Sequence, residues 1–176
     1  MNGIQRLTLW TSQGFGLGRF PVAPGTIGTL GGFPLLALLL LPGNFVFFTV
    51  GCLALGGISV WTSGEAEKLL SQSDPGSVVI DEIAAIPVCY LSWIIWLIAH
   101  NQAFPSPLFF FQPDNFMGTI GIFFAFRLFD VWKPWLIGQS QKLRAGWGIT
   151  VDDFLAALVV NFLVLGVLCI KTIGKP

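Results

Sequence analysis

The clearest scarcity in this sequence is charge. Only 10% of the 176 residues are Asp, Glu, Lys or Arg, while 54% are hydrophobic; soluble domains carry about 25% charged residues. This composition excludes an ordinary soluble domain and indicates an integral membrane protein. Nine basic and nine acidic residues leave no net charge, so the totals argue against nucleic acid as a partner, and the placement of the charges must carry the argument.

Histidine and cysteine are also scarce. His100 is the only histidine, and it lies in a loop away from the other polar segments, which argues against a His nucleophile or a Ser-His-Asp triad. No cysteine lies in a cationic loop, which argues against a Cys-phosphate intermediate. We expect three inert, buried thiols and neither a metal–thiolate motif nor a disulfide framework; they are Cys52, Cys89 and Cys169. The first residues lack a continuous apolar core, so we expect no signal peptide.

Long apolar runs are the main feature of the sequence. They cover residues 27–41, 45–61, 83–99, 116–129 and 154–170. Because helices satisfy their own backbone in lipid, the runs predict an all-α polytopic membrane protein with about four to five transmembrane or re-entrant helices, in a single domain over residues 1–176. The first run is about 22 Å long as a helix, less than the hydrocarbon core of about 30 Å, so a short span and a re-entrant segment both remain open.

The polar segments share one side of the membrane if all the runs cross. That side receives an N-terminal surface segment with Arg19, the loop at 62–82 and the loop at 127–153. The last loop is the most basic, and Lys/Arg-rich loops mark the cytoplasmic side. We therefore expect a site that faces the cytoplasm, although Lys171 and Lys175 on the other side count mildly against this orientation.

Carboxylates gather at the ends of the apolar runs. They are Asp81, Glu82, Asp130, Asp152 and Asp153. An acid at a helix N-terminus contributes about 0.3–1 kcal/mol, so Asp81 or Asp152 alone could be an N-cap. One cap needs one acid, however, and here two adjacent pairs and a fifth acid meet at one membrane face. Acids at membrane depth are usually functional, and oxygen ligands from several elements suit Mg²⁺.

A glycine-rich turn and a set of cations accompany these acids. The turn contains Pro24, Gly25, Thr26 and Gly28, with Thr26 as a possible N-cap. It offers free N–H groups to a phosphate, although an ordinary helix start explains it equally well. The cations are Arg19, Arg127, Lys133 and Arg144.

Helical spacing favours a role for two of these cations. Arg127, Asp130 and Lys133 recur every three residues and should lie close to one helix face. Arg binds phosphate in a bidentate way and Lys acts as a point charge, which favours phosphate binding by this pair. For Lys142, we favour a contact with lipid headgroups.

These residues leave acid-plus-metal chemistry as the main hypothesis. A metal-activated water would attack a phosphate whose charge Arg and Lys stabilise. The alternative is a small membrane transporter whose acidic cluster binds a cation in transit. A transporter predicts polar residues near the middle of the runs, where Asn161 is the main exception to an apolar pattern.

Four blocks of the sequence resemble the phosphatidylglycerophosphatase A family. They read APGTIGT, VVIDEIAA, FRLFDVWKPW and GITVDD, in the family's order and approximate spacing, and together they cover nearly the whole chain. The resemblance implies a Mg²⁺-dependent phosphatase of the bacterial inner membrane, which converts phosphatidylglycerophosphate to phosphatidylglycerol and inorganic phosphate. The sequence departs from the family where a glycine usually follows each acid pair, because Ala85 and Ala157 stand there.

The resemblance also implies roles for individual residues. Asp130, Asp81, Arg127 and Lys133 are expected to be catalytic. The expected metal ligands are Asp81, Glu82, Asp130, Asp152 and Asp153. The substrate phosphate is expected at Pro24, Gly25, Thr26 and Gly28, and we add Arg19 from the set of cations.

Overall fold

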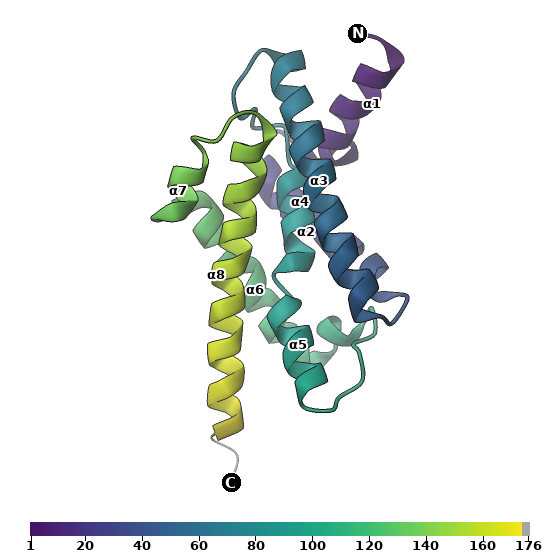
Figure 1. Cartoon of the computed structure of the whole chain (residues 1–176), viewed down its shortest axis with the longest axis vertical. Helices are drawn as coiled ribbons and strands as arrows, with labels where there is room; N and C mark the ends of the chain where they lie inside the picture. Colours follow the sequence, from purple (N-terminus) through teal and green to yellow (C-terminus); the bar gives the residue numbers. More distant parts are fainter. Residues whose placement is uncertain (174–176) are drawn as a thin grey trace.

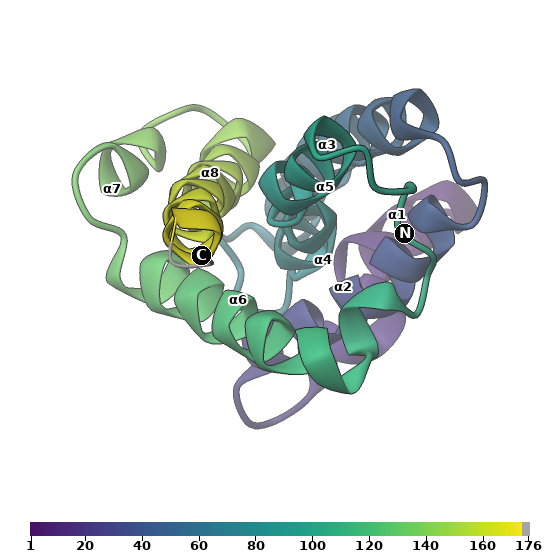
Figure 2. The same ribbon diagram turned by 90° about the horizontal axis from the view of Figure 1, so that it is seen from below.

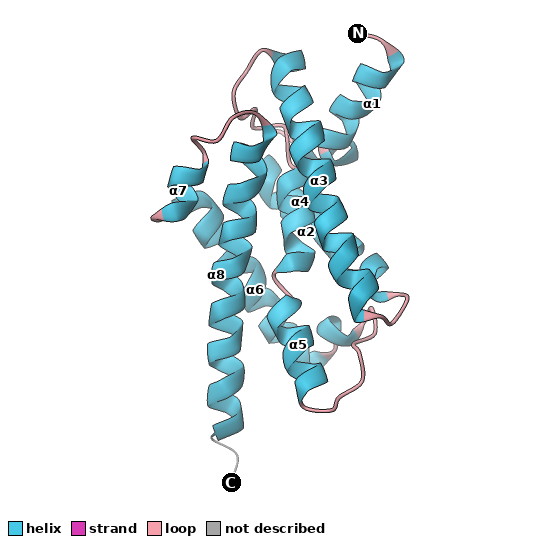
Figure 3. Ribbon diagram, in the orientation of Figure 1, coloured by secondary structure: helices cyan, strands magenta, loops and turns pink. Residues whose placement is uncertain are grey.

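The computed structural model describes residues 1–173, and over this range it consists of helices and their connections (Figure 3). Lys175 lies outside the described residues. The α-helices are α1 (Gly3–Ser12), α2 (Pro24–Leu40), α3 (Phe45–Leu70), α4 (Ile80–Val88), α5 (Leu91–Ala99), α6 (Pro113–Trp132), α7 (Leu136–Ser140) and α8 (Gly146–Ile173). Two 3-10 helices, η1 (Gly14–Arg19) and η2 (Phe109–Phe111), complete the set.

Three helical segments are long and apolar enough to cross a membrane, which confirms a polytopic membrane protein. They are Phe45–Leu70, Ile80–Ala99 and Gly146–Thr172, and Pro24–Leu40 is a shorter apolar helix. In the most apolar window of each segment, 72% of the residues of the middle one are buried, against 22% and 28% for the other two. The segment formed by α4 and α5 is therefore covered by protein, whereas α3 and α8 leave apolar side chains for lipid.

The arrangement of the helices places α4 at the centre of the molecule. Seen from below, α4 and α5 lie between α3, α8, α6 and α2 (Figure 2). α4 and α8 begin in the upper half of Figure 1 and α6 ends there, while the connections 41–44 and 100–112 lie in the lower half. The polar ends of these helices, including both acid pairs, therefore share one end of the bundle, as the crossing pattern predicts.

Two helices extend further than the apolar runs indicate. α3 continues from the apolar run to Leu70, where a loop was expected from Thr62, and its last turns carry an exposed Lys68–Glu65 ion pair. α8 begins at Gly146, two turns before Asp152. Its first turn packs on the backbone of α3, where a Cβ on Gly146 would clash with the carbonyl of Val60.

The segment Ile80–Ala99 is interrupted rather than continuous. Pro87 lies inside α4, and Cys89 and Tyr90 separate α4 from α5. The side chain of Asn161 repairs the break: its Nδ2 donates to the carbonyl of Val88 at 2.8 Å, and its Oδ1 accepts from the N–H of Ser92 at 2.7 Å. Buried backbone groups need such partners, so this polar residue in the middle of α8 has a structural task.

Candidate active site

Two helices bring three carboxylates to one point. Asp81 and Glu82 lie in the first turn of α4, and Asp153 lies in the eighth position of α8. One carboxylate oxygen from each lies within 4.8 Å of the others. All three groups are buried, since α4 is the central helix of the bundle.

These carboxylates have oxygen atoms without partners. Asp81 Oδ1, Glu82 Oε2 and Asp153 Oδ2 are buried and accept no hydrogen bond. An uncompensated buried charge costs several kcal/mol, and three such groups side by side also repel one another. A divalent cation bound by oxygen ligands would remove both costs, so the donor set fits a hard metal ion.

Arg127 links the acid cluster to two neighbouring helices. Its Nη1 donates to Asp130 Oδ2 at 2.5 Å, one turn further along α6, and lies 3.7 Å from Glu82 Oε1 on α4. The same nitrogen donates to the hydroxyl of Thr29 on α2 at 3.3 Å, and that hydroxyl donates to the carbonyl of Gly25. The guanidinium is thus held in place from three helices.

Lys133 pairs with Asp152 instead of joining Asp130. It is the residue that ends α6, in the left-handed region (φ +46°), and its Nζ donates to Asp152 Oδ2 at 2.5 Å. The expectation that Arg127, Asp130 and Lys133 share one helix face therefore holds only for the first two. Burial lowers the pKa of Lys133, but its hydrogen bond to Asp152 and the nearby carboxylates outweigh burial and raise that pKa, so the ammonium stays charged.

The start of α2 lies directly against this cluster. A Cβ on Gly25 would clash with Glu82 Oε1 and would lie 3.2 Å from both terminal nitrogens of Arg127. Gly28 packs instead on Val79, the residue before α4, where a Cβ would come within 2.7 Å of the valine Cβ. The N-terminal N–H groups of a helix lack intrahelical acceptors, so the first turn of α2 is suited to an anion beside the acids.

The cap predictions were wrong in detail. Ala23 (φ +48°) precedes α2, so Pro24 takes the first position and Thr26 lies inside the helix. Val79 is the N-cap of α4, and Asp152 is the seventh residue of α8. Since neither acid pair occupies a cap position, capping does not account for them.

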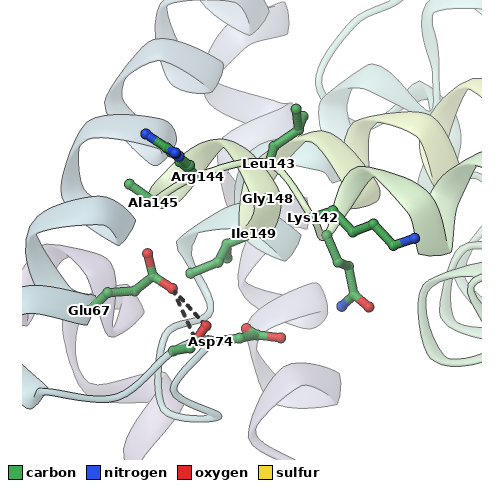
Figure 4. Close-up of a pocket in the computed structure, with 10 residues that line it drawn as sticks. Glu67, Asp74, Lys142, Leu143, Arg144, Ala145, Gly148 and Ile149 are labelled. Atoms are coloured by element: carbon green, nitrogen blue, oxygen red, sulfur yellow. Dashed lines mark hydrogen bonds between the residues drawn. The ribbon is translucent and has the colours of Figure 1, made fainter.

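The remaining predicted cations lie apart from these carboxylates. Arg19 is exposed and donates to Gln13 Oε1 at 2.7 Å, and Gln13 in turn donates to Ser77. Lys142 and Arg144 line a polar pocket of about 530 Å³ between the end of α3 and the α7–α8 connection. In Figure 4 these two side chains point away from each other, while Glu67 binds the N–H of Asp74 across the pocket.

His100 and the cysteines largely follow expectation. His100 follows α5 at the opposite end of the bundle, where its ring stacks on Trp96. Cys52 and Cys89 are buried. Cys169 is exposed on the apolar part of α8, which corrects the expectation that all three thiols are buried.

Comparison with known proteins decides the family. The family model of phosphatidylglycerophosphatase A matches residues 10–168. The chain belongs to the phosphatidylglycerophosphatase A family. It is thereby a membrane phosphatase.

Curated relatives agree with this assignment. The chain is 34% identical to a phosphatidylglycerophosphatase A of Haemophilus influenzae over 88% of this chain and 84% of the relative. It is 29% identical to that of Escherichia coli over 83% and 74%. It is also 30% identical, over 92% of both chains, to a Bacteroides thetaiotaomicron protein whose name provisionally assigns it as a phosphatidylinositol-3-phosphatase. No solved structure matches the chain.

Sequence reasoning missed one residue of the site in this family member. Thr29 is fully buried and joins Arg127 to the start of α2. It belongs to the APGTIGT block, one helical turn after Gly25. That spacing was visible in the sequence, but its partner Arg127 lies 98 residues away, and only the packing of α2 on α6 brings them together.

Proposed function

We propose that this protein is a Mg²⁺-dependent lipid phosphatase that hydrolyses phosphatidylglycerophosphate to phosphatidylglycerol and inorganic phosphate. The observation that carries the proposal is the convergence of three unpartnered carboxylate oxygens beside two fixed cations. The site would belong to the bacterial inner membrane and face the cytoplasm, since the basic α6–α8 connection lies at its end of the bundle. Residues 1–176 would form one domain around α4.

The metal would be held by Asp81, Glu82 and Asp153. When bound, Mg²⁺ supplies electrophilic assistance to the phosphoryl group and lowers the pKa of a water molecule. Asp130 and Asp152 lie next to this set, but each already accepts a short hydrogen bond from a cation. We therefore assign Asp130 the task of holding Arg127, and Asp152 that of holding Lys133. A further role of both carboxylates would be to bind a water molecule of the site.

The cations and the start of α2 would receive the phosphate. Arg127 and Lys133 stabilise the negative charge that develops on the phosphoryl oxygens, and both are already oriented by carboxylates. The N–H groups at Gly25 and Thr26 can donate hydrogen bonds to a further phosphoryl oxygen. Water attacks phosphorus and the bond to the glycerol oxygen breaks; a carboxylate of the acid cluster would take one proton from the water and pass it to that leaving oxygen, so that the products are the alcohol and inorganic phosphate.

The transporter alternative loses its main support. A transporter predicts polar residues in the middle of the spans, and Asn161 is the main residue of that kind. Its amide makes three hydrogen bonds to the backbone of α4, α5 and α8, so it is not available to a passing ion.

Phosphate release from the purified protein in detergent tests the proposal. Phosphatidylglycerophosphate is supplied with Mg²⁺ or with EDTA, beside phosphatidic acid and phosphatidylinositol 3-phosphate. We expect release that needs the metal and prefers phosphatidylglycerophosphate. Preference for the inositol lipid would replace the proposed substrate, and no release from any of the lipids by folded protein would overturn the proposal.

Thermal unfolding provides a second test of metal binding. A ligand at 100 times its Kd stabilises the folded state by about 2.7 kcal/mol, so Mg²⁺ should raise the Tm of the wild-type protein. The shift should disappear in Asp153→Asn and persist in Asp114→Asn, an acid in the first turn of α6 at the other end of that helix. Equal shifts in both variants would place the metal elsewhere.

A further inference from the structure

The outer side of α6 carries a hollow that shares Arg127 with the site. It measures about 750 Å³ and is lined by Phe124, Arg127, Leu128, Val131 and Trp132. The four apolar members recur every three or four residues or lie adjacent, so they share one side of the helix. Each is more than half exposed, from 58% for Leu128 to 71% for Val131. We call these four residues the α6 stripe.

Arg127 belongs both to this hollow and to the site. Its side chain is 19% exposed, whereas those of Asp130 and Glu82, which it contacts, are 10% and 12% exposed. The guanidinium therefore stands between an apolar surface and the buried acids. A negatively charged headgroup that approaches along the stripe would meet a positive charge before it meets a carboxylate.

The length of the stripe along α6 is comparable to the thickness of one leaflet of a membrane. From Phe124 to Trp132 is about 12 Å along a helix axis, close to half of a hydrocarbon core of about 30 Å. Trp132 lies at the end of α6 near Lys133 and Asp130, as expected for a tryptophan at the membrane–water boundary. The stripe thus runs along α6 from the level of the site towards the opposite end of the bundle.

We propose that the α6 stripe binds a hydrocarbon chain of the lipid substrate, and that the phosphate enters sideways from the bilayer past Arg127. This inference rests on the proposed function. It specifies the route and the lipid contact of the same site. A second apolar hollow, of about 520 Å³ between α5, α6 and α8, is bordered by Lys171 near the opposite end of the bundle and contains no residue of the site.

Kinetics with two substrates test the route. Val131→Trp would fill the hollow, and Leu128→Ala would remove one of its walls. With long-chain phosphatidylglycerophosphate we expect either change to raise KM roughly tenfold with little change in kcat, since exclusion of two methylenes from an apolar site costs about that factor. A water-soluble dibutanoyl analogue with the same headgroup should show no such rise.

The matched control is Val46→Trp, because Val46 of α3 is 68% exposed and lies at the other end of the bundle. It should behave as wild type with both substrates. An unchanged KM for the long-chain lipid in both α6 variants would overturn the proposal while wild-type turnover still supports the proposed function. A wild-type protein that releases no phosphate would instead count against the function itself.

Photocrosslinking tests the contact without reference to turnover. Vesicles carry a trace of phosphatidylglycerophosphate or of phosphatidylcholine, each with a diazirine in the middle of one chain, and EDTA prevents hydrolysis. We expect the first lipid to label the peptide that contains the α6 stripe several-fold more strongly, with competition by unlabelled substrate. Equal labelling by both lipids would mean that the stripe is ordinary lipid-facing surface and would overturn the proposal.

Discussion

Two buried polar residues of α8, Asn161 and Asp153, differ in whether their side chains have hydrogen-bond partners. Asn161 is 8% exposed, and its amide is satisfied by three backbone hydrogen bonds, two of them at the α4–α5 break and one within α8. Asp153 is 2% exposed, and its Oδ2 has no partner. The two residues are eight positions apart, about 12 Å along the helix, and both are buried.

The difference teaches how to interpret polar residues at membrane depth. Burial of either group is costly without partners. The fold supplies partners for Asn161 and withholds them from Asp153, which instead faces Asp81 and Glu82. A site that keeps like charges together at the expense of stability is typical of a binding or catalytic centre.

The strongest test of this comparison is Asp153→Asn. We expect kcat for lipid phosphate hydrolysis to fall on the order of 10³-fold, because removal of one electrostatic contact in a preorganised site costs about that much. The metal-free variant should unfold at the same temperature as wild type or higher, since a repulsive charge is gone. Phosphate release and thermal unfolding check both parts, and activity within tenfold of wild type would contradict the assignment.

The converse test is Asn161→Leu. It leaves the carbonyl of Val88 and the N–H of Ser92 without partners, and each unsatisfied buried group costs about 1–3 kcal/mol. We expect a loss of about 3 kcal/mol in the free energy of unfolding, with turnover per folded molecule within threefold of wild type. Denaturant unfolding in detergent measures the loss, with Phe162→Leu as the control because Phe162 is exposed. A stable but inactive variant would assign Asn161 to the site.

Gly25→Ala tests whether α2 must approach the acid cluster closely. The new methyl group would clash with Glu82 and crowd Arg127, so the start of α2 must move away from the acids. We expect kcat/KM to fall roughly 30-fold, about 2 kcal/mol, because misplacement of a positioned group is costly. Gly57→Ala is the control, since nothing lies within 4 Å of a Cβ there. Equal activity of the two variants would show that the close approach of Gly25 to Glu82 and Arg127 is not required for activity.

The smallest expected effect comes from Thr29. Thr29→Val removes the hydroxyl that Arg127 contacts and keeps the shape, so we expect kcat to fall about fivefold, corresponding to about 1 kcal/mol for one long hydrogen bond of 3.3 Å. Thr29→Ser retains the hydroxyl and should recover most of the activity. If serine and valine reduce kcat equally, Thr29 acts through packing and not through Arg127.

Much of the site could be predicted from the sequence because acids are rare in it. Asp81, Glu82 and Asp153 stand out against apolar surroundings, and the structure brings them together. The pairing of Lys133 with Asp152 could not be predicted, since Lys133 ends α6 in a left-handed conformation that turns it away from Asp130 towards α8. The position of Arg19 at Gln13 was equally hidden, because it depends on the bend at η1.

The helix boundaries could likewise be predicted only in part from the sequence. Apolar runs located every long helix, since membrane spans must be apolar. The end of α3 was predicted too early and the beginning of α8 too late. The polar turns at 62–70 and 146–153 are stabilised by packing on each other and not by lipid.

The sequence by itself determined the class of protein, the helices and the residue types of the site, since burial in lipid permits few charged residues and those few must have a purpose. The tertiary structure decided which charges are satisfied. Pairing depends on contacts between residues far apart in the chain, such as Arg127 with Thr29 and Lys133 with Asp152. The three carboxylate oxygens that lack a partner are therefore a property of the fold, because the packing of α4 against α8 removes them from water and from every other donor among the described residues.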